Sequence, residues 1–402
     1  MTIEPKKPRT KRVLWLQTQP EHYFNCMMDD LQRASPGDLE YVAAFSYAGP
    51  GWYQNNAPAV APSLLLTPRP GVKAPPAMRQ RFHENWRREL LSLDIDAAIV
   101  SGYGYRTHRE FIRACAQRRI PVAMFSDSNL RSQRGRGLKN RGRRWIKKRL
   151  LRPYIRDVAW LLTANRLGVA YWRYFGAPAD KIVLCPYYAD YPRAAAAAGI
   201  PREQVLQRVA LRPEDRYFFT AARLVPAKGI DLMIHAFRQL NLAAHRWHYI
   251  IAGVGPQESH LKAMAADLSA NIHFVGFQQP ADNLALMAHA EAMVLPSRYE
   301  PHGIVIQEAA SMGVPVLASD VCGAAADLVT PGVSGALFRS GDIKDLTARL
   351  RSITTDPSPL SQMRTGAREV FESWFRRTNP VRIADDIARR MLGIPPAERT
   401  AS

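Results

Sequence analysis

The chain has 402 residues, enough for two domains that each bury a core of their own. No run approaches the roughly 20 apolar residues of a membrane-spanning helix, and the apolar stretch 13–16 is too short for the core of a signal peptide. We therefore expect a cytoplasmic protein. No two of the four cysteines have C-x-x-C spacing, which predicts buried thiols and neither a disulfide framework nor a metal site: Cys26, Cys115, Cys185 and Cys322.

Charge is divided unevenly between the two halves of the chain, whose formal net charge is +20. Residues 1–195 carry 33 Lys and Arg against 15 Asp and Glu, a net charge of +18. Residues 196–402 carry 22 against 20, a net charge of +2. A field this one-sided predicts an anionic partner for the first half.

The first half alternates short apolar strands with helical patterns. Strands are predicted at 13–16, 39–45, 97–100, 120–125, 158–164 and 181–185, and helices at 23–33, 78–93, 107–119 (capped by Thr107) and 166–175. This alternation predicts a parallel sheet with helices on both faces. Ligands bind at the carboxyl ends of strands in such sheets, which places 102–105 and Ser126-Asp-Ser-Asn129 at a cleft. Asp127 could contact a ligand there, or Asp127 or Asn129 could cap the next segment.

The most charged segment is Arg131–Arg156, with twelve Lys or Arg and no acid. Apolar residues recur among these charges at helical spacing, namely Trp145, Ile146, Leu150, Leu151, Tyr154 and Ile155. This pattern is typical of a basic amphipathic helix that lies on an anionic bilayer. A solvated face and a stripe that binds nucleic-acid phosphates are the alternatives. Because no recognised nucleic-acid motif accompanies the segment, we expect no nucleic-acid partner.

The second half repeats the alternation after a predicted interdomain segment at 192–213. Strands are predicted at 217–220, 248–252, 272–277, 292–295 and 314–319, and helices at 230–240 and 304–312. Residues 320–326 are small and predict a loop whose N–H groups could reach a phosphate.

Residues 292–313 combine a strand, a turn that ends at Gly303 and a helix that starts at Ile304. The first N–H groups of a helix have no partner in the chain and the dipole is positive there, so this helix start predicts an anion site. Glu300 and Glu308 frame it. Taken alone, such a pair is more often two solvated surface acids. A phosphate bound at the helix start would have a carboxylate on each side, and each carboxylate could accept hydrogen bonds from hydroxyls. A ligand with a phosphate flanked by hydroxyl-rich groups is a nucleotide sugar.

This stretch resembles the donor-binding signature of family 4 glycosyltransferases. The signature has two glutamates with seven residues between them around Pro–aromatic–Gly, followed by Ala-Ala-x-x-Gly-x-Pro-Val; here His302 replaces the usual Phe. The resemblance covers most of 216–350 and includes Arg223 and Lys228-Gly229 at the head of a helix, with Ala227 in place of the usual Glu. It implies an α/β GT-B fold, in which two Rossmann-like domains face each other across a cleft. We expect an acceptor-binding domain at 1–192, a nucleotide-sugar domain at 193–375 and a helix within 376–402 that returns to the first domain.

The resemblance also implies a reaction. A sugar moves from a nucleotide-diphosphate sugar to an acceptor hydroxyl with retention of configuration, and with no metal or other cofactor. Arg223 and Lys228 would neutralise the leaving diphosphate, Glu300 would hold the transferred sugar and Glu308 the ribose. Six further residues are expected at the nucleotide: His302, Gly303, Ile304, Gly276, Phe277 and Gly253.

The first half departs from the family at two places. The loop after the first strand, glycine-rich in many relatives, is Thr18-Gln19-Pro20 here. The His that many relatives carry at the Ser126-Asp127 position is absent, which leaves Asp127 as the catalytic candidate there.

The basic first half predicts a lipid-linked saccharide as the acceptor, and an enzyme that is peripheral at the inner face of the cytoplasmic membrane. Two rival classes remain. One is a GT-B epimerase or phosphorylase. The other is a non-catalytic protein that binds membranes or nucleic acid, which the intact set of Arg223, Lys228, Glu300 and Glu308 disfavours.

Overall fold

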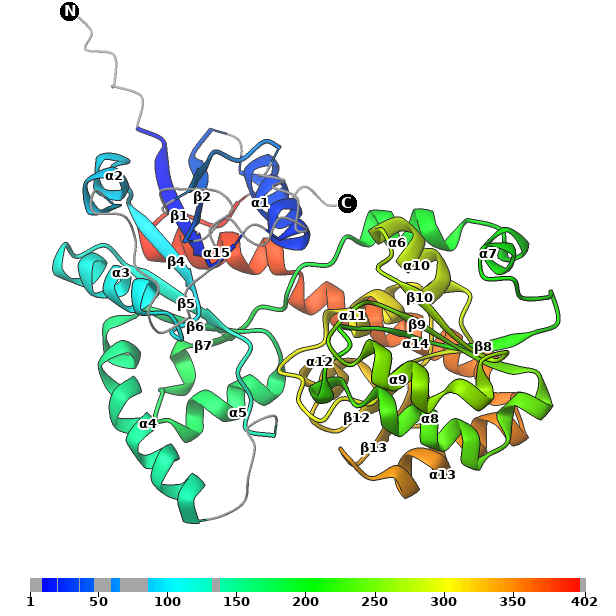
Figure 1. Cartoon of the computed structure of the whole chain (residues 1–402). Helices are drawn as coiled ribbons and strands as arrows, with labels where there is room; N and C mark the ends of the chain where they lie inside the picture. Colours follow the sequence, from blue (N-terminus) through cyan, green and yellow to red (C-terminus); the bar gives the residue numbers. More distant parts are fainter. Residues whose placement is uncertain are drawn as a thin grey trace, which may run out of the picture.

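The computed structural model describes residues 9–19, 21–35, 37–46, 59–65, 86–131 and 138–397. It contains two α/β domains that lie side by side, each around its own parallel sheet (Figure 1). The two sheets confirm the predicted α/β, GT-B architecture.

The first domain has a seven-stranded parallel sheet in the order β3-β2-β1-β4-β5-β6-β7. The strands are β1 (Lys11–Gln17), β2 (Leu39–Phe45), β3 (Ser63–Leu65), β4 (Ala97–Ser101), β5 (Val122–Ser126), β6 (Trp160–Thr163) and β7 (Ile182–Leu184). The helices are α1 (His22–Ala34), α2 (Trp86–Ser92), α3 (Arg106–Gln117), α4 (Leu138–Asp157) and α5 (Arg166–Tyr174), with a 3-10 turn η1 (Ala179–Lys181). Since helices cover both faces, the strand interiors are continuous apolar runs, as in the buried stretch 13–16.

The second domain has a six-stranded parallel sheet in the order β10-β9-β8-β11-β12-β13. The strands are β8 (Arg216–Ala221), β9 (Trp247–Ala252), β10 (Ile272–Gly276), β11 (Ala292–Leu295), β12 (Val316–Ser319) and β13 (Gly335–Phe338). The helices are α6 (Tyr191–Ala198), α7 (Arg202–Arg208), α8 (Ile230–Gln239), α9 (Glu258–Met264), α10 (Pro280–Ala288), α11 (Ile304–Ser311), α12 (Gly323–Leu328), α13 (Ile343–Thr355) and α14 (Pro359–Thr378). Three 3-10 turns complete it: η2 (Pro226–Lys228), η3 (Leu242–His245) and η4 (Ala266–Leu268).

The last helix, α15 (Pro380–Leu392), leaves the second domain and packs on the first (Figure 1). Trp374 of α14 is still in the second core, whereas Ala384 and Ile387 of α15 lie in a core of the first domain. Asn379 separates the two helices, and its side chain accepts a hydrogen bond from the N–H of Arg382 at the start of α15. The chain therefore passes between the domains twice: it enters the second domain before α6 and returns to the first before α15.

One local prediction is wrong, and two others are refined by the structure. Thr107 does not cap α3, because that helix starts one residue earlier and the Thr107 hydroxyl is buried without a partner among the described residues. The predicted interdomain segment 192–213 lies between the two sheets and contains helices, and Ala194 and Ala197 of its alanine run lie in the second core. Of the helix predicted at 78–93, only 86–92 is described as α2; residues 78–85 lie outside the described residues.

The strand order reverses direction at β1 in the first sheet and at β8 in the second. Ligands in open parallel sheets bind outside the carboxyl ends of the strands at such a switch point. The two switch points face one cleft, which is lined by Gln17 and Ser101 from the first domain and by Glu300 and Gly303 from the second.

Candidate active site

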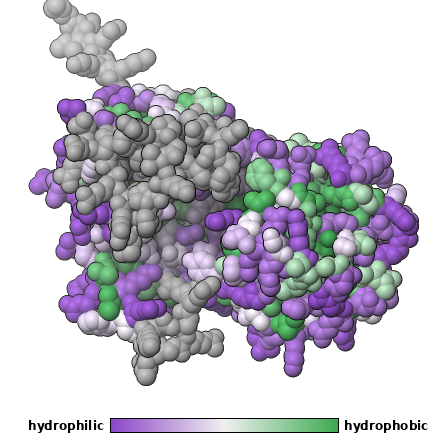
Figure 2. Space-filling view, viewed as in Figure 1, coloured by the Kyte–Doolittle hydropathy of each residue, from purple (hydrophilic) through white to green (hydrophobic). Residues whose placement is uncertain are grey.

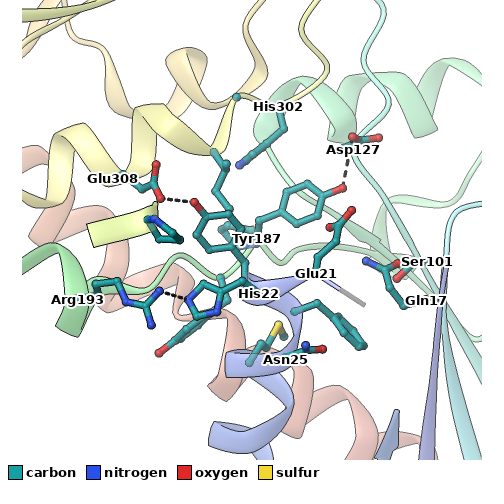
Figure 3. A pocket seen from close by; sticks show the side chains of 18 of the residues that line it. Gln17, Glu21, His22, Asn25, Ser101, Asp127, Tyr187, Arg193, His302 and Glu308 are labelled. Atoms are coloured by element: carbon teal, nitrogen blue, oxygen red, sulfur yellow. Dashed lines mark hydrogen bonds between the residues drawn. The ribbon is translucent and has the colours of Figure 1, made fainter. Parts of the chain in front are cut away.

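The cleft between the domains has a volume of about 980 Å³ and is lined by residues of both. Figure 3 shows Glu308 and Asp127 on opposite sides of it, with Tyr187 and His302 between them. Glu308 and His302 belong to the second domain, whereas Asp127 follows β5 of the first. The predicted residues Gly303, Ile304 and Phe277 also line the cleft.

Glu308 lies on α11, which begins immediately after Gly303 at φ +89°. Its side chain is 2 % exposed, and the Tyr23 hydroxyl from α1 of the first domain donates to Oε1 at 2.5 Å. Oε2 is buried and has no hydrogen-bond partner among the described residues. Burial raises the pKa of Glu308 to about 7, although the Tyr23 hydrogen bond acts in the opposite direction. An unpaired carboxylate oxygen in this position is suited to accept from a ligand hydroxyl.

Glu300 and Lys228 form an ion pair at the mouth of α11. The loop that carries Lys228 lies against the turn that carries Glu300, because the N–H groups of Arg298 and Tyr299 donate to the carbonyl of Ala227 at 2.7 and 3.1 Å. Gly229 permits this approach: its φ is +66°, and a Cβ there would lie 2.0 Å from the Pro296 carbonyl oxygen.

Arg223 is placed differently from Lys228. Its side chain is exposed, whereas that of Lys228 is partly buried, and neither residue is among those that line the cleft. It follows β8, and the next loop residue packs on the glycines after β9, because the Leu224 N–H donates to the Val254 carbonyl at 3.0 Å. The structure thus brings Lys228 and Glu300 together, whereas Arg223 is exposed to solvent earlier on the loop that carries Lys228.

Gly253 and Gly276 do not line the cleft, but they join the loops that follow β8, β9 and β10. The Gly253 N–H donates to the Gly276 carbonyl at 2.7 Å, and a Cβ at Gly253 would lie 2.0 Å from the Ala222 carbonyl oxygen. Phe277 follows with a side chain that is 57 % exposed. The role of Gly253 is therefore indirect, because its lack of a side chain lets two loops approach each other. The Phe277 ring, in contrast, lines the cleft itself.

Two asparagines of the first domain hold the turn between Glu300 and His302. Asn129 and Asn165 both donate from Nδ2 to the Pro301 carbonyl, at 2.9 and 3.1 Å, and both side chains are fully buried. Asn165 also accepts from the Gly168 N–H as the cap of α5. The Asn129 amide therefore crosses to the other domain, a contact beyond the local cap that the sequence offered for it.

His302 is buried beside Tyr187, with ring centroids 4.9 Å apart, and its Nδ1 lies 3.4 Å from the Asn165 amide. Burial lowers the pKa of His302 to about 4, so the ring is neutral at pH 7. Here it packs between the domains as an aromatic residue would, in the place where the family usually has Phe.

The first-domain wall is acidic. Asp127 accepts a hydrogen bond from the Tyr187 hydroxyl at 3.4 Å, and burial raises the pKa of Asp127, with a further increase from the charge of Glu300. Glu21 lines the same wall, and burial raises the pKa of Glu21 as well. The sequence pattern indicated Asp127 through its place after β5, but it carried no signal for Glu21 or Tyr187.

The small residues at 320–326 do not form the open loop that the sequence predicts. Most of them lie in α12, whose start packs against the 301–302 turn. The Ala324 N–H donates to the His302 carbonyl at 2.8 Å, and a Cβ at Gly323 would lie 2.1 Å from the Pro301 carbonyl oxygen. The Ala324 N–H is therefore already used within the protein.

His22, Cys26 and Asp190 are the one described group close enough to share a metal ion. Asp190 Oδ2 lies 2.9 Å from His22 Nε2, but Arg193 Nη1 lies 2.9 Å from the same nitrogen (Figure 3). The guanidinium already supplies the positive charge that Asp190 needs. The other three cysteines are buried and free.

Comparison with known proteins identifies the second domain. Residues 201–370 match the family described as Glycosyl transferases group 1. This stretch is a group 1 glycosyltransferase domain. It contains Arg223, Lys228, Glu300 and Glu308, and it confirms the resemblance on which those residues were chosen.

Curated relatives match only part of this chain. A GDP-mannose-dependent monoacylated alpha-(1-6)-phosphatidylinositol monomannoside mannosyltransferase of Corynebacterium glutamicum is 33 % identical over 159 residues, which cover 38 % of this chain and 41 % of that protein. The chain spans between 37 % and 47 % of the length of four curated relatives, two of them mannosyltransferases and two of them glycogen synthases.

Solved structures match over the whole chain at lower identity. Anabaena HepE in complex with UDP has a TM-score of 0.69 and 18 % identity, covering 96 % of this chain and 100 % of that one. WaaG, a glycosyltransferase involved in lipopolysaccharide biosynthesis, has a TM-score of 0.65 and 15 % identity, covering 95 % and 100 %. These likenesses show that the first domain completes the fold.

Within the described ranges, no helix has both the length and the apolar character that crossing a membrane requires.

Proposed function

We propose that the protein is a retaining, metal-independent glycosyltransferase, which moves a sugar from a nucleotide-diphosphate sugar to an acceptor hydroxyl at the border of its two domains. The observation that carries the proposal is the buried Glu308 carboxylate, which keeps Oε2 unpaired inside the 980 Å³ cleft. A cleft of this size with a few convergent polar groups is typical of small-molecule sites.

The donor fits the second-domain side of the cleft. Its ribose hydroxyls would donate to Glu308, its diphosphate would lie at the start of α11, and its base would contact the exposed Phe277 ring. That Anabaena HepE was solved with UDP supports a nucleoside diphosphate as the anionic part of the donor. Glu300, held by Lys228, would accept from hydroxyls of the transferred sugar.

The transfer step exchanges one bond for another at the anomeric carbon. The bond from that carbon to the diphosphate oxygen breaks, and the acceptor oxygen bonds to the same face. The acceptor proton passes to the departing phosphate oxygen, so no protein base is consumed. Lys228, with Arg223 at the rim, and the α11 start would stabilise the charge that develops on the diphosphate, which makes a metal ion unnecessary. Asp127 would orient the acceptor hydroxyl from the opposite wall.

The acceptor is proposed to be a lipid-linked saccharide, reached from an anionic membrane surface through α4. Three large apolar side chains of this helix are strongly exposed: Trp145 at 61 %, Ile146 at 53 % and Leu150 at 65 %. Figure 2 shows apolar side chains among hydrophilic ones at the lower left, where α4 lies in Figure 1. Apolar residues flanked by Lys and Arg, within a domain this basic, are typical of helices that rest in a headgroup layer.

The structure reduces the part of α4 that could contact a membrane. Leu151, Tyr154 and Ile155 of α4 are buried in the first-domain core, so of the six apolar residues only Trp145, Ile146 and Leu150 are open to a membrane. This corrects the amphipathic pattern, in which all six apolar residues shared one face. Residues 132–137 of the basic segment lie outside the described residues.

The test is a screen of UDP-, GDP- and ADP-sugars by thermal shift, followed by an assay of sugar transfer with excess EDTA. We expect at least one donor to raise the melting temperature, and transfer to continue in EDTA. Transfer that stops in EDTA and returns with Mg²⁺ or Mn²⁺ would refute metal independence. Conversion of the donor to an epimer without an acceptor would favour the epimerase alternative.

A further inference from the structure

A second cavity of about 530 Å³ adjoins the cleft and belongs to the first domain alone. It lies at the carboxyl ends of β1, β4 and β5, and its wall includes Ser101–Tyr105 and Ser126–Ser128. Glu21, Asp127 and Tyr187 line both this cavity and the cleft, so they form the border between the two. A molecule in this cavity would therefore reach the place where a donor sugar ends.

Lys147 is the only cation among the described residues that line this cavity. Its ammonium Nζ lies 5.2 Å from the ring centroid of Tyr171 and 5.6 Å from those of Tyr103 and Phe175. It makes no ion pair with a described carboxylate, whereas Lys228 and Lys262 both do. Three rings thus hold the ammonium in place without neutralising its charge.

The wall beside Lys147 is fixed before any ligand binds. Arg109 Nη1 donates to the carbonyls of Tyr103 and Gly104 at 2.8 and 2.9 Å, which holds the loop after β4. The Tyr103 hydroxyl is hydrogen-bonded to the Tyr171 hydroxyl. A preformed wall lowers the ordering that binding would require, so the position of the ammonium can select among ligands.

The charges in this cavity are separated by position. Glu21 and Asp127 stand at the border with the cleft, whereas Lys147 lines only the second cavity. Carboxylates at the border accept from hydroxyls and repel an anion. The ammonium attracts an anion and cannot accept a hydrogen bond.

We infer that the acceptor carries a phosphate or carboxylate group that binds Lys147, while its reacting hydroxyl lies between Asp127 and the donor sugar. This inference rests on the proposed function, and it narrows the acceptor class to anionic saccharides. The anionic group is either the phosphate that links a saccharide to its carrier or an acid on the saccharide itself. Because Lys147 lies on α4, next to the exposed apolar residues, one helix would hold both the membrane and the acceptor's charge.

The test measures binding of soluble saccharides to the full chain, so that membrane attraction does not enter. The probes are methyl α-glucoside, glucose 1-phosphate, glucuronate and inorganic phosphate, each titrated by saturation-transfer NMR without nucleotide. We expect one or both of the charged sugars to bind at least about tenfold more tightly than the neutral glucoside. Glucose 1-phosphate and glucuronate distinguish a linking phosphate from a sugar acid, and inorganic phosphate shows how much the anion alone contributes.

Lys147→Gln should remove the preference for charged sugars, and Lys148→Gln, an exposed neighbour that does not line the cavity, should retain it. Equal binding of charged and neutral sugars by the parent, a preference that survives Lys147→Gln, or no binding of any probe at tens of millimolar would each overturn the inference. The outcome is separable from the proposed function: loss of nucleotide binding would refute that function and leave this preference measurable.

Discussion

The two walls of the cleft are built in different ways. On the second-domain side, glycines at positive φ bring backbone segments together: Gly229 meets Pro296, Gly253 meets Ala222, and Gly303 opens α11. On the first-domain side, the wall consists of side chains, among them Asp127, Glu21 and Tyr187, on loops after the strands. The backbone-built wall suits a ligand part that does not vary, such as a diphosphate, whereas a wall of side chains can change with the acceptor.

Charge follows the same division. The second half of the chain carries a net charge of +2 and pairs Lys228 with Glu300, whereas the first half carries +18 and leaves Lys147 without a described ion-pair partner.

The largest effect is expected at the membrane surface of the first domain. Replacement of five cations of α4 with Gln should weaken binding to phosphatidylglycerol vesicles by roughly 10³-fold or more, since each contributes about 1 kcal/mol near an anionic surface. The five are Arg143, Arg144, Lys147, Lys148 and Arg149. Co-sedimentation of the parent at low salt, with release at high salt, is the measurement.

The matched control removes five exposed cations from the second domain: Arg208, Arg212, Arg216, Arg349 and Arg351. It should retain most of the vesicle binding. Equal loss in both variants would mean that net charge, and not α4, decides the attraction. A parent that ignores vesicles but binds RNA or DNA tightly would favour the nucleic-acid alternative.

On the donor side, Lys228→Ala should lower turnover by about 10²-fold or more, because it removes a preorganised charge next to the diphosphate. Lys262→Ala is the matched control, since Lys262 also pairs with a glutamate, Glu258 at 2.8 Å, but on the exposed helix α9. Initial rates of sugar transfer provide the comparison. Similar rates in the two variants would remove Lys228 from the site.

The link between the walls should show a smaller effect. Asn129→Ala removes one of two hydrogen bonds to the Pro301 carbonyl, so we expect turnover to fall by about fivefold with little change in nucleotide affinity. Asn271→Ala serves as control, because its amide donates to the Trp247 carbonyl at 3.1 Å, at the opposite end of the second sheet. A drop in nucleotide affinity equal to the drop in turnover would place Asn129 in donor binding instead of domain contact.

The smallest effect concerns pH. The pKa of Glu308 in the folded protein, about 7, lies above its ordinary value of 4.5, so the folded state binds more protons in that window and stability falls as pH rises through it. Glu308→Gln removes this loss. Its melting temperature should therefore exceed that of the parent by roughly 3 °C more at pH 8 than at pH 5. A difference that does not change with pH would mean that Glu308 is already ionised in the folded protein.

The contrast between the walls also explains what the sequence could predict. Gly303, Glu300 and Glu308 occupy fixed spacings along one segment, and a strand, turn and helix follow from local pattern, so the donor wall was predictable. The contact of Tyr23 with Glu308 joins residues 285 positions apart, and those of Asn129 and Asn165 with Pro301 also cross between domains. No local pattern encodes such contacts, because they depend on how the domains close.

Other differences have local causes. The interdomain segment 192–213 is not extended, because its alanine run has high helix propensity and forms α6. In α4, apolar residues at helical spacing divide between two surfaces: Leu151 packs in the core, whereas Leu150 is exposed. Sequence spacing alone does not distinguish these two environments.

The central claim is that a nucleotide binds in the cleft against Glu308, and calorimetric titration of UDP, GDP and ADP tests it most directly. We predict that at least one of them binds the parent, and that Glu308→Gln weakens this binding by about tenfold or more through loss of a charged acceptor for ribose hydroxyls. Glu372→Gln, an exposed glutamate on α14, should bind like the parent. If no nucleotide binds the parent, or if Glu308→Gln binds it with unchanged affinity, the assignment of the donor site is contradicted.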